Sequence, residues 1–319
     1  MTKVAVFGLG GTIAMTAGEH GGAVPALSAG QLVAAVPGLA ESGIELAVVE
    51  FRQLPGASLT FADLAELADA IAAHDADGVV ITQGTDTIEE TAYQLDLTHA
   101  DDRPLVVTGA MRNPSLAGAD GPANLLAAVR VAADPAARGL GCVVVLADEV
   151  HAAARVRKTH STSVATFRSP NGGPLGYLVE GGFHLVNRPA HRLVLPRATT
   201  HPKVALATIT LDDDGTLLAA ADRCDGLVVA AMGVGHVPQR LLSTLDHLAA
   251  RIPVVLASRT GAGPVLTTTY GFPGSERDLV ARGLIPAGYL DLLKARILLR
   301  HLLATGAGQA AIKAAFARS

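Results

Sequence analysis

The feature that most constrains the fold is an alternation of short apolar runs with longer segments of helical spacing. The runs contain many β-branched residues and end at Gly, Pro or polar residues; they lie at 4–7, 79–82, 105–108, 143–146, 204–211, 227–231 and 254–258. Helical spacing follows at about 86–98, 123–133, 239–249 and 290–304. This alternation predicts an α/β fold, a parallel sheet with crossover helices, and the fully apolar run at 79–81 indicates that both faces are covered.

The clearest helix is predicted to begin after Thr60. Thr60 is a good N-cap, Asp63 follows three residues later, and Leu64, Leu67 and Ile71 share one face. The pattern predicts an amphipathic helix packed on the sheet.

Helical and strand spacing both fail near residues 187–202, where prolines stand at 189, 196 and 202. The 319 residues are enough for two domains. We therefore predict a larger N-terminal α/β domain over 1–188, with a mostly parallel sheet flanked by helices. We also predict a linker over 189–203, followed by a smaller, flavodoxin-like C-terminal α/β domain over 204–319.

Composition excludes several classes of protein. The net charge is −4 with no basic run, and aromatic residues make up 3% with no Trp, so a nucleic-acid surface is not expected. The longest apolar stretches, 143–147 and 227–235, are far shorter than the ~18 residues of a spanning helix. Cys142 and Cys224 form no disulfide framework, and no signal-peptide pattern opens the chain, so a cytoplasmic enzyme is expected.

Sites in open α/β sheets form where strands end, and the first strand ends in a glycine-rich turn at 8–11 followed by Thr12. A dinucleotide fingerprint would need glycine where Ile13 stands, which argues against a nicotinamide oxidoreductase. Glycines there allow a ligand to approach the backbone, and the Thr12 hydroxyl is a candidate nucleophile. Taken alone, the segment is better explained as a tight turn.

The second strand ends in Thr82-Gln83-Gly84-Thr85-Asp86, which places Thr85 and Asp86 at the mouth of the sheet. Lys158 lies among hydroxyl-bearing residues further along and is a candidate base for a hydroxyl relay. Taken separately, Asp86 is explained as an acid at a helix N-terminus, and Lys158 as a surface charge.

In combination, these residues resemble the bacterial-type L-asparaginase and glutaminase family. The resemblance rests on Gly-Gly-Thr-Ile-Ala at 10–14, Gly-Thr-Asp-Thr-Ile-Glu-Glu-Thr-Ala at 84–92, Gly-Ala-Met-Arg at 109–112 with Ala-Asp-Gly-Pro at 119–122, and Lys158 followed by 164–167 and 173–177. It continues more faintly through the Gly-Val-Gly at 233–235 and the segment 294–299. Order and spacing agree from end to end.

The resemblance implies a catalytic set of Thr12, Thr85, Asp86 and Lys158. Thr12 would attack the side-chain amide carbon of L-asparagine, release ammonia and form an ester that water cleaves. Thr85 and Lys158, steadied by Asp86, would form a hydroxyl–amine relay. Asp86 would also pair with the substrate's α-ammonium group. The family uses no metal or organic cofactor.

The resemblance also implies the groups that bind the substrate. Backbone N–H groups around Gly11 and Gly84 would stabilise the oxyanion, and the Ala110 carbonyl would face the departing nitrogen. The family assembles as a dimer of dimers with sites between the N-domain of one subunit and the C-domain of a neighbour. The turn at 233–236 would approach the neighbour's site, with His236 where many members carry Asn.

Three positions depart from the family pattern. The lid segment, 15–31, lacks the family's tyrosine; Glu19 or His20 are possible substitutes, and a solvated loop is the simpler interpretation. The serine that grips the α-carboxylate is replaced by Gly56, so backbone groups of Gly56 and Ala57, or Ser58 in a register shifted by two, would take its place. Gln83 stands where secreted members often carry His.

Two functional alternatives remain open from the sequence. One is a preference for glutamine or a D-amino-acid amide within the same reaction class. The other is a non-catalytic relative that binds an amino acid, as the missing tyrosine and serine suggest, although the Lys158 relay argues against it.

Overall fold

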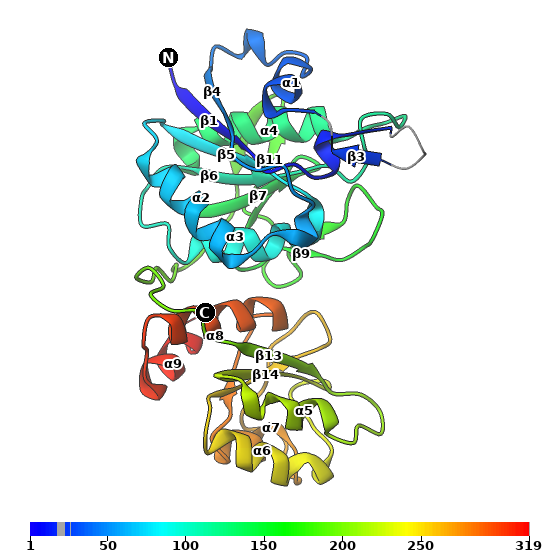
Figure 1. Ribbon diagram of the computed structural model, residues 1–319, viewed down its shortest axis with the longest axis vertical. Coiled ribbons are helices and arrows are strands. Elements are labelled where there is room, and N and C mark those ends of the chain that lie inside the picture. The colour runs from blue at the N-terminus through cyan, green and yellow to red at the C-terminus, as the bar shows by residue number, and fades with distance from the viewer. Residues whose placement is uncertain (18–22, 26, 319) are drawn as a thin grey trace. The chain divides into compact units, whose positions relative to one another are not determined.

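A computed structural model describes residues 1–17, 23–25 and 27–318. The chain divides into two compact units, Met1–Ala190 and His191–Ser319 (Figure 1). Each unit has its own sheet and its own apolar core.

An eight-stranded sheet in the order β12-β11-β8-β7-β6-β5-β1-β4 forms the N-terminal unit. Strands β4, β1, β5, β6 and β7 run parallel, and β8, β11 and β12 continue the sheet antiparallel. The strands are β1 (Lys3–Gly8), β4 (Glu45–Glu50), β5 (Gly78–Thr82), β6 (Leu105–Thr108), β7 (Cys142–Leu146), β8 (Glu149–Ala152), β11 (Gly176–Val179) and β12 (Gly182–Leu185). Two further antiparallel pairs are β2 (Met15–Ala17) with β3 (Ala23–Pro25), and β9 (Arg157–Lys158) with β10 (Phe167–Arg168).

Helices cover both faces of this sheet. They are α1 (Ala29–Ala34), α2 (Phe61–Ala73), α3 (Ile88–Asp96) and α4 (Gly121–Ala133), with 3-10 turns η1 (Thr12–Ala14), η2 (Ala40–Ser42), η3 (Gly56–Ser58), η4 (Thr85–Thr87) and η5 (Pro135–Ala137). Val4 and Val6 share a core with Leu125 of α4, whereas Phe7, which points to the other face, meets the His74 ring at the end of α2. All five residues of β5 are buried, as expected for a sheet covered on both faces.

The capping box predicted at Thr60 is present. The Thr60 side chain accepts a hydrogen bond from the Asp63 N–H, and the Asp63 carboxylate accepts one from the Thr60 N–H at 2.9 Å. Leu64, Leu67 and Ile71 are buried on one face. The helix therefore begins and packs as its sequence predicts.

The C-terminal unit contains a four-stranded parallel sheet, in the order β13-β14-β15-β16. Its strands are β13 (Val204–Thr208), β14 (Gly226–Ala231), β15 (Val254–Ser258) and β16 (Ile285–Pro286). Its helices are α5 (Thr216–Ala220), α6 (Leu242–Ala249), α7 (Glu276–Ala281), α8 (Leu292–Ala304) and α9 (Gln309–Phe316), with 3-10 turns η6 (Ala221–Arg223) and η7 (Gln239–Leu241). Leu245 and Leu248 of α6 pack on one face of the sheet, and α8 contacts β13, β14 and β15.

The predicted fold class, a larger mostly parallel sheet and a second α/β unit, is confirmed. The helix predicted over 86–98 is shorter, because residues 85–87 form a 3-10 turn before α3 begins at Ile88. The edge strand β4, which begins at Glu45 and ends at Glu50, was not among the predicted elements. Residues 186–203 contain no helix or strand, and the linker over 189–203 and the domain boundaries stay predictions.

Within the described residues, none of the helices combines the length and the hydropathy needed to cross a bilayer.

Candidate active site

The site is built where three neighbouring parallel strands end together. Gly8 at the end of β1 pairs with Thr82 of β5, and Thr82 pairs with Thr108 of β6. The segments that follow these strands therefore emerge at one edge of the sheet, the place where open α/β folds bind ligands. This edge gathers the turns that carry Thr12, Thr85 and Ala110.

Of the three glycines predicted to lie at the substrate site, Gly84 lies against both Gly11 and Gly56. Gly11 has a φ of +88°, and a Cβ placed on it would lie 2.1 Å from the backbone nitrogen of Gly84. A Cβ on Gly56 would lie 2.8 Å from the Gly84 carbonyl oxygen. Any larger residue at Gly11 would force the first and second turns apart. The sequence requires glycine here because backbone meets backbone.

Lys158 meets Thr85 and Asp86 although more than 70 residues separate them in the sequence. The Lys158 Nζ donates to the Thr85 Oγ1 at 3.0 Å and to the Asp86 Oδ1 at 3.1 Å. The Thr85 residue is 6% exposed, the Lys158 side chain 18% and the Asp86 side chain 66%. The mostly buried Lys158 side chain thus lies beside the Thr85 hydroxyl group. The Asp86 carboxylate, its second partner, faces solvent.

Lys158 is held at its backbone by Glu89, which was not among the predicted site residues. The Lys158 N–H donates to the Glu89 Oε1 at 3.1 Å, and Glu89 is buried on the first turn of α3. The strand β9 that carries Lys158 is two residues long and pairs with β10. No sequence pattern signals this tether, because it joins segments 69 residues apart.

Side-chain hydrogen bonds stabilise the third turn, which follows β6 and carries Ala110. The Asp120 carboxylate accepts from the N–H groups of Met111 and Arg112, at 3.0 and 2.8 Å. The Asn124 amide donates to the Gly109 carbonyl at 3.0 Å. Ala110 is fully buried within this turn.

Thr12 opens the turn η1 directly after Gly11 and is partly buried. Its neighbour Gly11 contacts Gly84, which precedes Thr85. Among the described residues, no hydrogen bond joins the Thr12 hydroxyl to Thr85 or Lys158. The structure therefore brings Thr85, Asp86 and Lys158 together by direct contacts and places Thr12 on the adjoining turn.

The remaining predicted site residues are either exposed or outside the described part of the chain. Ala57 and Ser58 are exposed on η3 beside the buried Gly56. Glu19 and His20, the possible substitutes for the lid tyrosine, lie outside the described residues. Within the described part of the chain, no group of three His, Cys, Asp or Glu side chains is placed to hold a metal ion.

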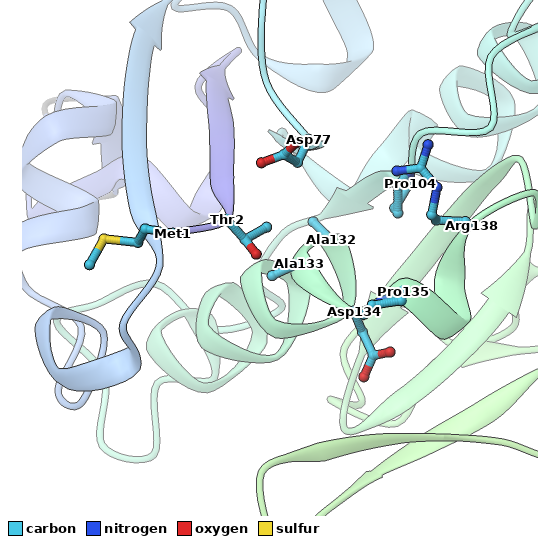
Figure 2. Close-up of a pocket in the computed structure, with 9 residues that line it drawn as sticks. All are labelled: Met1, Thr2, Asp77, Pro104, Ala132, Ala133, Asp134, Pro135 and Arg138. Carbon is cyan, nitrogen blue, oxygen red and sulfur yellow. The ribbon is translucent and has the colours of Figure 1, made fainter.

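A cavity of about 300 Å³ lies at the opposite edge of the sheet, where β1, β5 and β6 begin (Figure 2). Its lining consists of Met1, Thr2, Asp77, Pro104, Ala132, Ala133, Asp134, Pro135 and Arg138. None of the predicted site residues is among them. Asp77 and Asp134 already accept backbone hydrogen bonds from Lys3 and Ala136, so both serve the local structure.

In the C-terminal unit, the turn at 233–236 ends in a hydrogen-bonded network. The His236 Nε2 lies 3.2 Å from the Glu276 Oε2, and Glu276 is fully buried and also accepts from the N–H groups of Thr269 and Tyr270. Burial raises the pKa of Glu276, but these hydrogen bonds outweigh it, so the pKa lies below its ordinary value. The ring centroids of His236, Tyr270 and Phe272 lie 4.9–6.2 Å from one another.

Family models match both units of the chain. Residues 3–191 match "Asparaginase, N-terminal", and residues 203–316 match "Glutaminase/Asparaginase C-terminal domain". The chain belongs to the asparaginase family. It is accordingly an amidohydrolase, and the family resemblance expected from the sequence is confirmed.

Similar members of the asparaginase family span the whole chain. A probable L-asparaginase of Deinococcus radiodurans is 37% identical, over 99% of this chain and 97% of that protein. An L-asparaginase of Bacillus licheniformis is 36% identical, over 95% and 96%. The crystal structure of a probable cytoplasmic L-asparaginase from Campylobacter jejuni superposes with a TM-score of 0.89, at 33% identity and 100% coverage of both chains.

Proposed function

We propose that this chain hydrolyses the side-chain amide of L-asparagine to L-aspartate and ammonia. The observation that carries the proposal is the 3.0 Å contact of the Lys158 amine with the Thr85 hydroxyl at the glycine-lined edge of the sheet. An amine beside a hydroxyl can move a proton between nucleophile, leaving group and water, which amide hydrolysis requires. The names of the similar proteins favour the same substrate.

In the proposed reaction, the Thr12 oxygen attacks the side-chain carbonyl carbon and its proton enters the Thr85–Lys158 relay. The C–N bond breaks as the relay returns a proton to the nitrogen, and ammonia leaves. Water then attacks the Thr12 ester, gives its proton to the relay, and releases aspartate while the Thr12 hydroxyl is restored. Each half-reaction uses the relay once as base and once as acid.

The substrate's charges fit the exposed parts of the site. We assign its α-ammonium group to Asp86, whose carboxylate is largely exposed beside Lys158. We assign the α-carboxylate to backbone groups of Gly56 and Ala57 or to Ser58, all three of which lie on η3. The amide oxygen is assigned to N–H groups around Gly11 and Gly84, and the departing nitrogen to the Ala110 carbonyl.

We further propose that the chain acts as a homo-oligomer, a dimer of dimers, in the cytoplasm. The solved relative from Campylobacter jejuni is described as a probable cytoplasmic L-asparaginase. In this assembly the turn that carries His236 would approach a neighbour's site. Light scattering of the purified protein tests the oligomer: a monomer at all concentrations would contradict it.

Ammonia release from L-asparagine by the purified protein is the decisive test. We expect Thr12→Ala to abolish it and Thr98→Ala, which removes a hydroxyl beyond α3, to leave it intact. Full activity of Thr12→Ala would exclude Thr12 as the nucleophile. Calorimetric binding of aspartate without turnover of asparagine would instead identify a non-catalytic relative.

Glutamine is the second candidate substrate, because the matched C-terminal family model also covers glutaminases. Parallel assays with L-asparagine, L-glutamine and D-asparagine would rank them. A higher kcat/KM for glutamine would replace asparagine in the proposal and leave the catalytic residues unchanged.

A further inference from the structure

Gln83 is a fully buried amide that links two turns of the site. Its Nε2 donates to the Gly84 carbonyl oxygen at 3.2 Å and to the Thr87 Oγ1 at 3.3 Å. Thr87 in turn donates to the Gly56 carbonyl at 3.0 Å. One side chain behind the site therefore connects the turn after β5 with the turn η3.

The neighbours of Gln83 determine how its amide is oriented. Only the NH₂ group can face the Gly84 carbonyl, and the Thr87 hydroxyl hydrogen is already used toward Gly56, so Thr87 also accepts from Gln83. The Oε1 is consequently left buried with no hydrogen-bond partner among the described residues. An apolar side chain of similar size would remove this unsatisfied acceptor but would also take the donor away from the Gly84 carbonyl, so the two effects on stability oppose each other.

The bond to the Gly84 carbonyl has a consequence on the opposite side of the same peptide unit. No peptide bond among the described residues is cis, so the Gly84 C=O and the Thr85 N–H point in opposite directions. Glycine offers little resistance to rotation of that unit. Holding the carbonyl toward Gln83 therefore fixes the direction of the Thr85 N–H.

The Thr85 N–H makes no hydrogen bond within the described part of the chain, so it can donate to a substrate. Thr85 is the first residue of η4, and the first N–H groups of a helix have no acceptor within it. Gly11 packs against Gly84, so the Thr12 turn adjoins this peptide unit.

We propose that Gln83 is a positioning residue that aims the Thr85 N–H at the oxygen of the reacting amide. The inference rests on the proposed amide hydrolysis, in which negative charge develops on that oxygen. Gln83 itself does not touch the substrate. Its unsatisfied oxygen is the stability cost of holding the donor in place.

Gln83→Met tests this proposal by separating catalysis from stability. One well-aimed oxyanion donor contributes ~10²- to 10³-fold to kcat, and a misdirected donor retains part of that. We expect kcat for asparagine to fall ~10- to 100-fold, KM to change less than about 3-fold, and Tm to change little, because the lost hydrogen bonds and the relieved acceptor oppose each other. Gln83→His, which can still present an N–H, is expected to recover part of the loss. The matched control Gln94→Met changes the same side chain type on α3, seven residues beyond Thr87, and should leave kcat unchanged.

Unchanged kcat in Gln83→Met would overturn the proposal, as would a fall of kcat only in step with Tm. Hydrogen–deuterium exchange of the peptide covering residues 83–88 supplies a readout independent of turnover. The proposal expects faster exchange in Gln83→Met than in the wild type and in Gln94→Met; equal rates would refute it. If the wild type releases no ammonia, the proposed function fails, while the exchange experiment still decides whether Gln83 fixes this peptide.

Discussion

Two lysines, one in each unit, show what separates a reactive lysine from a structural one. Lys158 on β9 bonds to the Thr85 hydroxyl and to Asp86, 72 residues away in the sequence. Lys294 on α8 is fully buried and bonds at 2.6 Å to Asp291, three residues earlier. Both have a carboxylate partner, so charge pairing alone does not distinguish them.

The two pairs differ in how far each carboxylate is exposed to solvent. The Asp291 carboxylate also caps α8 by accepting from the N–H groups of Leu293 and Lys294, and its side chain is only 10% exposed. This pair is closed to solvent. Lys158 instead combines a neutral hydroxyl that can exchange a proton with a carboxylate that faces solvent. A relay needs both an exchangeable partner and access for substrate.

The largest expected effect is that of Lys158→Met on catalysis. Loss of a general acid–base group costs ~10²- to 10⁴-fold in rate, and we expect kcat for asparagine to fall by that factor. Unfolding stability should change by ~1 kcal/mol or less, because the partner Asp86 is exposed. Ammonia release and thermal unfolding measure the two effects.

The exposed Lys313 provides the control for this substitution. Lys313→Met should change neither kcat nor Tm. A Lys158→Met protein that keeps its activity, or loses it only because it unfolds, would remove the functional half of the comparison.

Lys294→Met is the converse experiment. Removing one member of a buried pair costs ~3 kcal/mol or more when the other charge is left without its partner, and Asp291 then keeps the backbone donors of Leu293 and residue 294. We expect a loss of ~3 kcal/mol in urea unfolding, with the specific activity of the folded protein within about twofold of the wild type. Wild-type stability would show that the buried pair adds nothing over a methionine.

Glycines extend the comparison from side chains to backbone. Gly11 and Gly233 both have positive φ, +88° and +51°, but a Cβ on Gly11 would meet the Gly84 nitrogen at 2.1 Å, whereas a Cβ on Gly233 meets nothing within 4 Å. Gly233→Ala should therefore cost only the ~1–2 kcal/mol of a left-handed alanine. Gly11→Ala should cost ~2 kcal/mol more and lower kcat, because it separates the two turns. Equal stabilities of the two variants, measured by urea unfolding, would contradict the close approach.

Sequence patterns predicted the fold where the signal is local. The Thr60 capping box and the apolar runs of β5 and β7 are each specified within a few residues. The Thr85, Asp86 and Lys158 grouping was inferred from family resemblance, because no local pattern indicates that residues 72 apart meet. Glu89 and Gln83 were not recognised as holding the site, because their contacts with Lys158 and Gly84 depend on the tertiary turn geometry.

The smallest expected effect is on the pH dependence of stability, and it comes from His151, a buried imidazole that is neutral where the lysines pair with carboxylates. Burial, and secondarily the charge of Arg168, lower the pKa of His151 to about 4, and burial also lowers the pKa of His301 in the C-terminal unit. The Glu149 Oε2 lies 3.3 Å from the His151 Nε2, which favours protonation, but this nitrogen makes no hydrogen bond among the described residues. Burial therefore dominates, and His151 stays neutral in the folded protein above about pH 4.

The sign of the resulting pH dependence follows from proton binding. With a folded pKa of about 4 and an unfolded value near 6.5, the unfolded chain binds the extra proton between these values, so stability falls as pH falls. From pH 7.5 to 5.5 His151 should contribute a loss of about 1.3 kcal/mol, which His151→Gln removes. Urea unfolding at the two pH values measures it, and the exposed His184 on β12, replaced by Gln, should leave the slope unchanged. If stability instead falls more steeply as the pH is lowered in His151→Gln than in the wild type, the Glu149 carboxylate outweighs burial and His151 is protonated in the folded protein.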